Sequence, residues 1–379
     1  MAQLIFGDFA PLFDVASTVN PTFRFHTVGG RRSVLCFVGD ATAPANRQAV
    51  ASLTALHEAL SRQHLTHVFL VSTDPADQAE GRLADIAGPC TVFWDFDLGI
   101  ARRYGMVEET PEGPRVRPGS VLIDENLRYV ATLPVDAPAD HGVRMARLVH
   151  ALPNYGPARM VLRQAPVLII PNVLPREFCR HLIGLYDADG GEDSGYMTER
   201  DGKTVGVIDY SHKRRRDYLV QEEPVKAALR HAINRRVAPE IRKAFNFEIT
   251  RLERYLVACY DAATGGYFRP HRDNTTKGTA HRMFAMSLNL NAEEYEGGDL
   301  RFPEYGLDTY RAPTGGAVVF SCSLMHEATP VTKGRRYAFL PFFYNEAGDR
   351  IRQANLQYLA DGAAKPATPA PAPAEEPVP

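Results

Sequence analysis

The sequence lacks the cysteine pattern of a disulfide-bonded or structural-zinc protein. Its 379 residues contain five cysteines, which are widely scattered and form no CxxC pair. An odd number of dispersed cysteines disfavours a disulfide framework, and without paired cysteines a structural zinc site is also disfavoured. The pattern favours a reducing compartment, so we expect a cytoplasmic protein.

Long apolar runs and an excess of one charge are missing as well. No apolar stretch approaches the ~18 residues that a membrane span needs. The first eight residues show neither the basic nor the apolar region of a secretory signal. Lys and Arg number 43 against 45 Asp and Glu, a net charge of −2. We therefore expect neither nucleic acid nor membrane as a partner.

What the sequence does contain is enough apolar material for more than one core. Hydrophobic residues make up 45% of the chain, and its length corresponds to two or three domains at roughly 100–200 residues each. Residues 1–155 alternate apolar strand and helix patterns, which predicts an α/β domain with helices on both faces of a sheet. The expected strands are 33–38, 67–71, 89–93 and 120–123, and the expected helices are 46–63 and 144–152.

The pattern changes after residue 156. Residues 156–350 begin with a strand at 166–170 and helices at 175–186 and 225–245, the second kinked at Pro239. Short β segments then predict an antiparallel sandwich or barrel, at 252–259, 283–290, 317–320 and 337–343. The domain boundary should fall within 153–163. The Pro/Ala-rich residues 363–379 are expected to form a disordered tail.

Three residues have the chemistry of a metal site. His271 and Asp273 are two positions apart in a β context, so their side chains should point to the same face. His326 is the candidate for a third ligand. Two histidines and one carboxylate leave three positions of an iron open, as in the facial triad of non-haem Fe(II) oxygenases. Zinc accepts the same ligands, so the triad alone does not decide the metal.

An arginine follows at a spacing that favours a cosubstrate site. A turn at Gly334 would return the chain beside the His326 segment, so that Arg336 faces the same cavity. A guanidinium can hold a carboxylate through two parallel hydrogen bonds. Arg335 should point to the opposite face.

Residues 166–344 resemble the prolyl 4-hydroxylase-type 2-oxoglutarate- and Fe(II)-dependent dioxygenases. The matching features are Tyr260, Gly266-Tyr267, His271-Arg-Asp273, 296–302, 313–320, His326 and 334–337. The resemblance implies a double-stranded β-helix (jelly-roll) with supporting helices, in an α+β two-domain protein. It also implies His271, Asp273 and His326 as catalytic metal ligands, selects Arg336 as the 2-oxoglutarate residue, and places the Tyr260 hydroxyl on the same carboxylate. Residues 283–289 lack a tyrosine that some relatives have there.

The implied reaction is hydroxylation of a C–H bond, with release of succinate and CO₂. Its cofactors are Fe(II), 2-oxoglutarate as cosubstrate and O₂, with L-ascorbate (vitamin C) as reductant in many relatives. Prolyl residues in proteins, free amino acids and small metabolites all stay open as substrates. A protein side chain is the preferred expectation.

Residues 1–155 carry a second resemblance, to the thioredoxin-fold peroxiredoxins. The matching features are Gly7–Pro11, 33–38, Asp95-Phe-Asp97, 101–105 and 121–124. Thr42 is kept, but Ala45 stands where that family has its peroxidatic cysteine. Without a thiolate the peroxide chemistry has no nucleophile. We expect a catalytically degenerate docking module, or a homodimerisation module.

Two other functions remain as alternatives: a thiol peroxidase acting through Cys36 or Cys90, and a non-catalytic sensor of O₂ or 2-oxoglutarate. The basic run 212–216 is interpreted as a solvated face or the rim of the site, and His281 as a surface or loop residue. Cys259 and Cys322 are expected to be small buried apolar residues.

Overall fold

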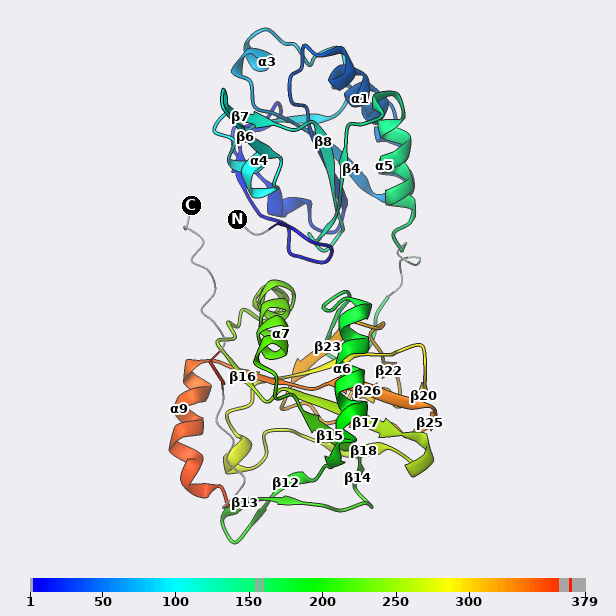
Figure 1. The fold of residues 1–379 in the computed structure, drawn as a ribbon, viewed down its shortest axis with the longest axis vertical. Helices are drawn as coiled ribbons and strands as arrows, with labels where there is room; N and C mark the ends of the chain where they lie inside the picture. Colours follow the sequence, from blue (N-terminus) through cyan, green and yellow to red (C-terminus); the bar gives the residue numbers. More distant parts are fainter. Residues whose placement is uncertain (1–2, 154–155, 157, 159, 361–367, 370–379) are drawn as a thin grey trace. The chain divides into compact units, whose positions relative to one another are not determined.

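The computed structural model describes residues 3–153, 156, 158, 160–360 and 368–369. The chain divides into two compact units, Met1–Ala158 and Arg159–Pro379 (Figure 1). Among the described helices, none combines the length and apolar character of a membrane span. The predicted disordered tail lies outside the described residues, except for Thr368–Pro369, which form the short strand β28.

The first unit is built on a five-stranded mixed sheet. In spatial order its strands are β5 (Thr91–Trp94), β4 (Thr66–Ser72), β3 (Arg32–Phe37), β8 (Gly119–Ile123) and β9 (Tyr129–Pro134). The β3–β4 and β4–β5 pairs are parallel, and the pairs of β8 with β3 and β9 are antiparallel. Every residue of β3 is buried. This fits a central strand whose apolar run shows no polar face.

Helical segments cover both faces of this sheet, as the sequence predicts. Val34 and Cys36 of β3 join the core that includes α1 (Pro44–Thr54), α2 (His57–His64) and α5 (His141–His150). Leu35 and Phe37 point the other way, into the core that includes α4 (Gly99–Arg103) and the 3₁₀ helix η1 (Phe25–Val28). The single helix expected over 46–63 is divided in the structure into α1 and α2. The remaining elements are β1 (Asp14–Val15), β2 (Phe23–Arg24), α3 (Pro75–Ala79), β6 (Val107–Thr110), β7 (Gly113–Val116) and η2 (Pro138–Asp140).

The second unit is built mainly on two antiparallel sheets, beside two smaller two-stranded ones. In spatial order, the strands of the larger sheet are β11 (Glu192–Asp193), β15 (Arg216–Leu219), β17 (Leu256–Asp261), β26 (Arg335–Phe339), β19 (Phe284–Asn289), β27 (Phe342–Tyr344), β16 (Arg251–Glu253) and β28. Beside this row, β23 (Ala317–Ser321) pairs with both β19 and β10 (Leu168–Ile170). The smaller runs β14 (Lys213–Arg214), β18 (Tyr267–His271), β24 (His326–Ala328), β21 (Leu300–Arg301), β22 (Thr309–Tyr310). Leu256 of β17 packs with Phe268 of β18 and Ala328 of β24, so the sheets lie face to face.

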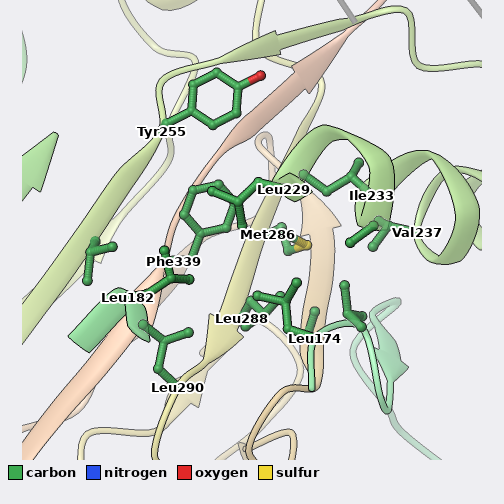
Figure 2. Packing of buried hydrophobic residues seen from close by; sticks show 14 of the residues in the cluster. Leu174, Leu182, Leu229, Ile233, Val237, Tyr255, Met286, Leu288, Leu290 and Phe339 are labelled. Carbon is green, nitrogen blue, oxygen red and sulfur yellow. The ribbon is translucent and has the colours of Figure 1, made fainter. Parts of the chain in front are cut away.

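Helices cover the outer face of the larger sheet. These are α6 (Arg176–Asp189), α7 (Glu223–Arg236) and α8 (Ala238–Phe245). Figure 2 shows Leu229 and Ile233 of α7 in one cluster with Met286, Leu288 and Phe339 of the sheet. Because strand side chains alternate, Ser287, between Met286 and Leu288, and Arg336, next to Tyr337 of the same cluster, face the other sheet. The remaining strands form a hairpin of β12 (Tyr196–Arg200) with β13 (Lys203–Val207) and an antiparallel pair of β20 (Glu296–Gly297) with β25 (Val331–Lys333). The other elements are α9 (Glu346–Asn355), η3 (Ala262–Thr264), η4 (Lys277–Thr279) and η5 (Leu356–Tyr358).

Two predicted continuous elements are interrupted. The helix expected over 225–245 ends at Arg236 and resumes at Ala238, because the ring of Pro239 crowds the carbonyl four residues earlier. The strand expected over 252–259 breaks between β16 and β17 at Arg254, whose φ is +59°. A left-handed backbone cannot continue a strand. The chain therefore turns at Arg254.

Candidate metal centre and cosubstrate pocket

The two histidines of the predicted triad are brought together by strand pairing. His271 ends β18 and His326 begins β24, and the two are direct partners in the antiparallel register. Their ring centroids lie 4.3 Å apart. The 54 residues between them form the returning strands, so local sequence spacing does not reveal this contact.

Asp273 completes the group. Its carboxylate oxygens lie 3.6 Å from Nε2 of His271 and 3.4 Å from Nε2 of His326. One ligand atom from each residue falls within 4.8 Å of the others, a spacing that can hold a metal ion. Asp273 lies in the turn after β18 rather than in the strand, and its N–H bonds to the Cys322 carbonyl at 3.0 Å. The side chains of His271 and Asp273 point to the same side, as predicted, but a turn after the strand places Asp273 there rather than strand alternation.

The backbone orients both imidazoles. Nδ1 of His271 lies 2.7 Å from the Arg269 carbonyl, and Nδ1 of His326 lies 3.0 Å from the Leu324 carbonyl. Because a carbonyl only accepts, each Nδ1 carries the proton and donates it. Each Nε2 faces the Asp273 carboxylate, so that a metal ion bound between them would take its lone pair. Such outer hydrogen bonds are typical of metal-binding histidines.

Electrostatics favour the metal-binding protonation states of Asp273 and His326. Burial alone would raise the pKa of Asp273, but His326, His271 and Arg282 lower it below its usual range. Burial lowers the pKa of His326 to about 4, against the opposing effect of Asp273. At neutral pH the site offers a carboxylate and a neutral imidazole at His326. This donor set fits Fe(II), and it also fits zinc.

Arg336 lines the same cavity from the opposite sheet. The chain does not return beside β24 as the sequence suggests. Instead it passes through β25 and Gly334, at φ +74°, into β26 of the larger sheet. There Arg336 is only 2% exposed, while Arg335 is exposed and pairs with Asp261. The expected opposition of the two arginines is confirmed, and strand alternation explains it.

The surroundings of Arg336 suit a carboxylate ligand. Its Nη2 donates to Ser287 Oγ at 2.7 Å, and its guanidinium lies 5.0 Å from the centre of the Tyr260 ring. Its Nε is buried without a hydrogen-bond partner among the described residues. No carboxylate in the described part of the chain lies within ion-pair distance of it. A buried cation with an unsatisfied donor is costly unless a ligand completes it.

Around these residues lies a cavity of about 490 Å³. Two basic side chains of the run 212–216, which was expected at a solvated face or at the rim of the site, line this cavity. Lys213 and Arg215 are buried in its wall, whereas the intervening Arg214 is exposed. Arg215 pairs twice with Asp217, at 2.6 Å each, and donates to the Tyr260 hydroxyl at 3.3 Å. The interpretation of 212–216 as a solvated face is therefore wrong for these two residues, and their alternating positions were the available signal.

A buried group of charged side chains, Glu253, His281 and Arg282, contacts the backbone of the metal-ligand segment. His281 is buried, not a surface residue, and its Nε2 lies 2.8 Å from Glu253. Glu253 also pairs with Arg282, whose Nη1 lies 3.4 Å from the Asp273 carbonyl. Burial opposes ionisation of Glu253, but Arg282 and His281 hold its pKa well below the usual range.

Among the described residues of the first unit, no comparable cluster of metal-ligating side chains is found. Cys36 and Cys90 are buried, and burial raises their pKa values to about 11 and about 12. Ala45 is exposed in the first turn of α1. The thiolate needed by a thiol peroxidase is therefore absent from both predicted positions.

Comparison with known proteins agrees with this division. Residues 255–344 match the 2OG-Fe(II) oxygenase superfamily, and residues 6–130 match the AhpC/TSA family. A PKHD-type hydroxylase of Pseudomonas fluorescens is 36% identical over 117 residues, which are 28% of this chain and 50% of that protein. A PKHD-type hydroxylase of Burkholderia thailandensis is 30% identical over 185 residues, 45% of this chain and 75% of that protein. The chain spans 39% of two Synechococcus PKHD-type hydroxylases.

Two solved structures were also compared. A Trichoplax adhaerens prolyl hydroxylase, in complex with a hypoxia inducible factor peptide fragment, has TM-score 0.41 and 17% identity over 50% of this chain and 87% of that one. Peroxidoxin BcpB of Mycobacterium tuberculosis has TM-score 0.37 and 14% identity over 40% of this chain and 100% of that one.

The second unit carries an oxygenase domain of the 2OG-Fe(II) class, preceded by a thioredoxin-like, peroxiredoxin-related domain. More narrowly, the chain belongs to the family of PKHD-type hydroxylases.

Proposed function

We propose that the chain is an Fe(II)- and 2-oxoglutarate-dependent dioxygenase that hydroxylates a C–H bond. One observation carries the proposal. His271, Asp273 and His326 converge in a cavity that also contains Arg336, a buried guanidinium with no carboxylate partner among the described residues.

His271, Asp273 and His326 would hold the metal, and their backbone hydrogen bonds would keep both Nε2 atoms directed at it. When bound, Fe(II) supplies the chemistry that splits O₂, with one oxygen atom entering succinate as CO₂ leaves 2-oxoglutarate and the other entering the substrate. The protein's own contribution is to place the reactants and exclude water.

Arg336 would bind the far carboxylate of 2-oxoglutarate. Ser287 holds one arm of the guanidinium, and the Tyr260 ring supports it from the side. Arg215 fixes the Tyr260 hydroxyl within the same wall. This arrangement leaves the Arg336 Nε free to donate, so binding of the cosubstrate would satisfy a donor that is otherwise buried and unpaired.

Several finer points belong to the same proposal. We interpret the two facing sheets as the double-stranded β-helix of this class. L-ascorbate is proposed as the reductant, a protein side chain or a small molecule as the substrate, and the cytoplasm as the location. For the first unit we propose a non-catalytic docking or homodimerisation role, which the burial of Cys36 and Cys90 supports.

The test measures succinate formation and O₂ uptake by the purified full chain with Fe(II) and 2-oxoglutarate. His271→Ala and His326→Ala should reduce both signals to background. His231→Ala, on the exposed face of α7, is the matched control and should retain them. Binding of Mn(II), followed by electron paramagnetic resonance, should be lost in the same two variants. A wild-type chain that binds no divalent metal would refute the proposal.

A further inference from the structure

In the described part of the chain, one of the cations that line the cavity has neither an acidic partner nor a hydrogen-bond partner at the end of its side chain. Its lining contains six lysines and arginines but a single carboxylate, Asp273; the cations are Lys213, Arg215, Arg254, Arg272, Arg282 and Arg336. Three of them have acidic partners just outside the cavity, Arg215 with Asp217, Arg282 with Glu253 and Arg272 with Glu304. Lys213 donates to Ser194 Oγ and to the Gly195 carbonyl. Under the proposed function Arg336 is used by 2-oxoglutarate, so only Arg254 remains.

Arg254 is fixed through its Nε atom and the face of its guanidinium, while its two Nη atoms have no protein partner among the described residues. Its Nε donates to the Leu340 carbonyl at 3.1 Å, and its guanidinium stacks 4.2 Å from the centre of the Phe342 ring. Among the described residues no carboxylate lies within ion-pair distance, and neither Nη atom has a protein hydrogen-bond partner. The two Nη groups are therefore available to a ligand in the cavity.

The position is close to the metal ligands. Arg282 stacks on the same Phe342 ring, at 4.1 Å, and contacts the backbone carbonyl of Asp273. A group bound by Arg254 would thus lie one aromatic ring away from the arginine that supports the triad. Repulsion from Arg282 and Arg215 adds to burial in lowering the pKa of Arg254 to about 10, so an anion would relieve an unfavourable charge.

The backbone at this position is also strained. Arg254 adopts φ +59° between β16 and β17. A long side chain is disfavoured in that conformation, whereas glycine adopts it freely. Strain of this kind at a non-glycine residue tends to occur at ligand-binding sites.

We propose that the substrate carries a carboxylate and that Arg254 binds it, so that the enzyme hydroxylates an acidic residue or another carboxylate-bearing compound. This rests on the proposed function for the reaction, although not for the binding. A carboxylate matches the planar fork of one guanidinium and its single charge. A phosphate dianion would leave charge uncompensated, because Lys213 already donates to protein oxygens.

The test uses five matched probes on the full chain. These are the N-acetyl methylamides of aspartate, glutamate, asparagine, glutamine and phosphoserine. In the first arm, metal-free protein is unfolded in a calorimeter with each probe at millimolar concentration. In the second, the chain is loaded with Mn(II) and 2-oxoglutarate, and affinity is read from paramagnetic broadening of each probe's acetyl methyl signal.

We expect a carboxylate probe to bind at least about tenfold more tightly than its amide counterpart, as expected for a charge-assisted hydrogen bond. Arg254→Met should abolish this preference, and Arg254→Lys should retain part of it. Arg216→Met, at an exposed arginine outside the cavity lining, should leave it unchanged. Arg254→Gly is the second variant, because glycine suits the backbone there and keeps the test valid if Arg254→Met folds poorly.

Equal binding of carboxylate and amide probes overturns the proposal, as does the absence of any binding. A preference that survives Arg254→Met overturns it too, because it would assign the carboxylate to Arg336. Tightest binding by the phosphoserine probe replaces carboxylate with phosphate and also overturns it. Failure of Mn(II) to bind refutes the proposed function instead, and the metal-free arm still decides the role of Arg254.

Discussion

At the scale of single residues, backbone conformation controls what the site can bind. Gly298 has φ +67° and lies beside Arg336, the arginine proposed to bind 2-oxoglutarate. A Cβ added there would lie 3.1 Å from Cδ of Arg336 and 2.7 Å from a methyl of Val331. Glycine is thus needed twice, for its φ and for the space that Arg336 occupies.

We predict that Gly298→Ala weakens 2-oxoglutarate binding. The new methyl must displace Arg336, and loss of a charge-assisted hydrogen bond costs about 1.5–3 kcal/mol. The 2-oxoglutarate concentration for half-maximal succinate formation should rise roughly tenfold or more, while Mn(II) affinity stays the same.

The matched control is Gly265→Ala. Gly265 has the same φ, +67°, but an added Cβ there meets nothing within 4 Å. Gly265→Ala should introduce the same backbone strain but leave the affinity for 2-oxoglutarate unchanged. Equal effects of the two substitutions would mean that strain, not displacement of Arg336, weakens binding.

Residue identity alone explains part of the site. The types and order of His271, Asp273 and His326 made them candidates from the sequence, and the family resemblance was needed to select Arg336. The run 212–216 was assigned to a solvated face or the rim of the site without singling out Lys213 and Arg215. Only alternation along a buried strand edge separates its inward from its outward residues. Arg254 was missed because a left-handed φ at a non-glycine residue has no reliable sequence signal.

At the scale of secondary structure, most elements follow from local periodicity, whereas their pairing does not. The apolar run at 33–38 predicts β3, and the spacing of Val225, Leu229 and Ile233 predicts α7. The partner of β26 was predicted wrongly, because Gly334 permits either a hairpin or a crossing to the other sheet. Burial of Tyr337 and Phe339 against the helices favours the crossing.

One contact between elements of the first unit predicts a pH effect. His141 begins α5 and lies fully buried, with Nε2 2.8 Å from Ser120 Oγ of β8. Burial and the nearby Arg144 lower its pKa below the usual value of 6.5. The positive end of the helix dipole acts in the same direction. The folded chain therefore keeps His141 neutral at a pH where the unfolded chain is already protonated.

We predict that this histidine costs the first unit stability in acid. Below about pH 6.5 the unfolded state binds the extra proton, so the free energy of unfolding falls as pH falls, by at most about 1.4 kcal/mol per pH unit. Between about pH 7.5 and pH 5.5, the free energy of unfolding should fall more for the wild type than for His141→Gln.

Urea unfolding followed by tryptophan fluorescence measures this difference. The chain has one tryptophan, Trp94, and it lies in β5 of the same unit, so its signal reports this unit. A difference that stays constant with pH would show that His141 is protonated in the folded chain as readily as in the unfolded one.

At the scale of the whole molecule, both units bury their thiols. All five cysteines are buried, and burial raises the pKa of each thiol, to about 11 for Cys36 and Cys259 and about 12 for Cys90 and Cys179, with Cys322 also well above its usual value. The sequence indicates the missing peroxidatic cysteine directly. Inertness of the remaining thiols follows only from the packed cores of both units, which composition does not reveal.

We predict that the folded chain has no rapidly reacting thiol and that one substitution creates one. Ala45 is exposed in the first turn of α1, where the helix dipole stabilises a thiolate. Ala45→Cys should therefore add a single thiol that reacts with a chromogenic disulfide reagent at neutral pH, while the wild type reacts only slowly. In denaturant the wild type should show its five thiols, and the variant one more. Fast reaction of the folded wild type, lost in Cys36→Ala or Cys90→Ala, would instead restore the thiol peroxidase as the function of the first unit.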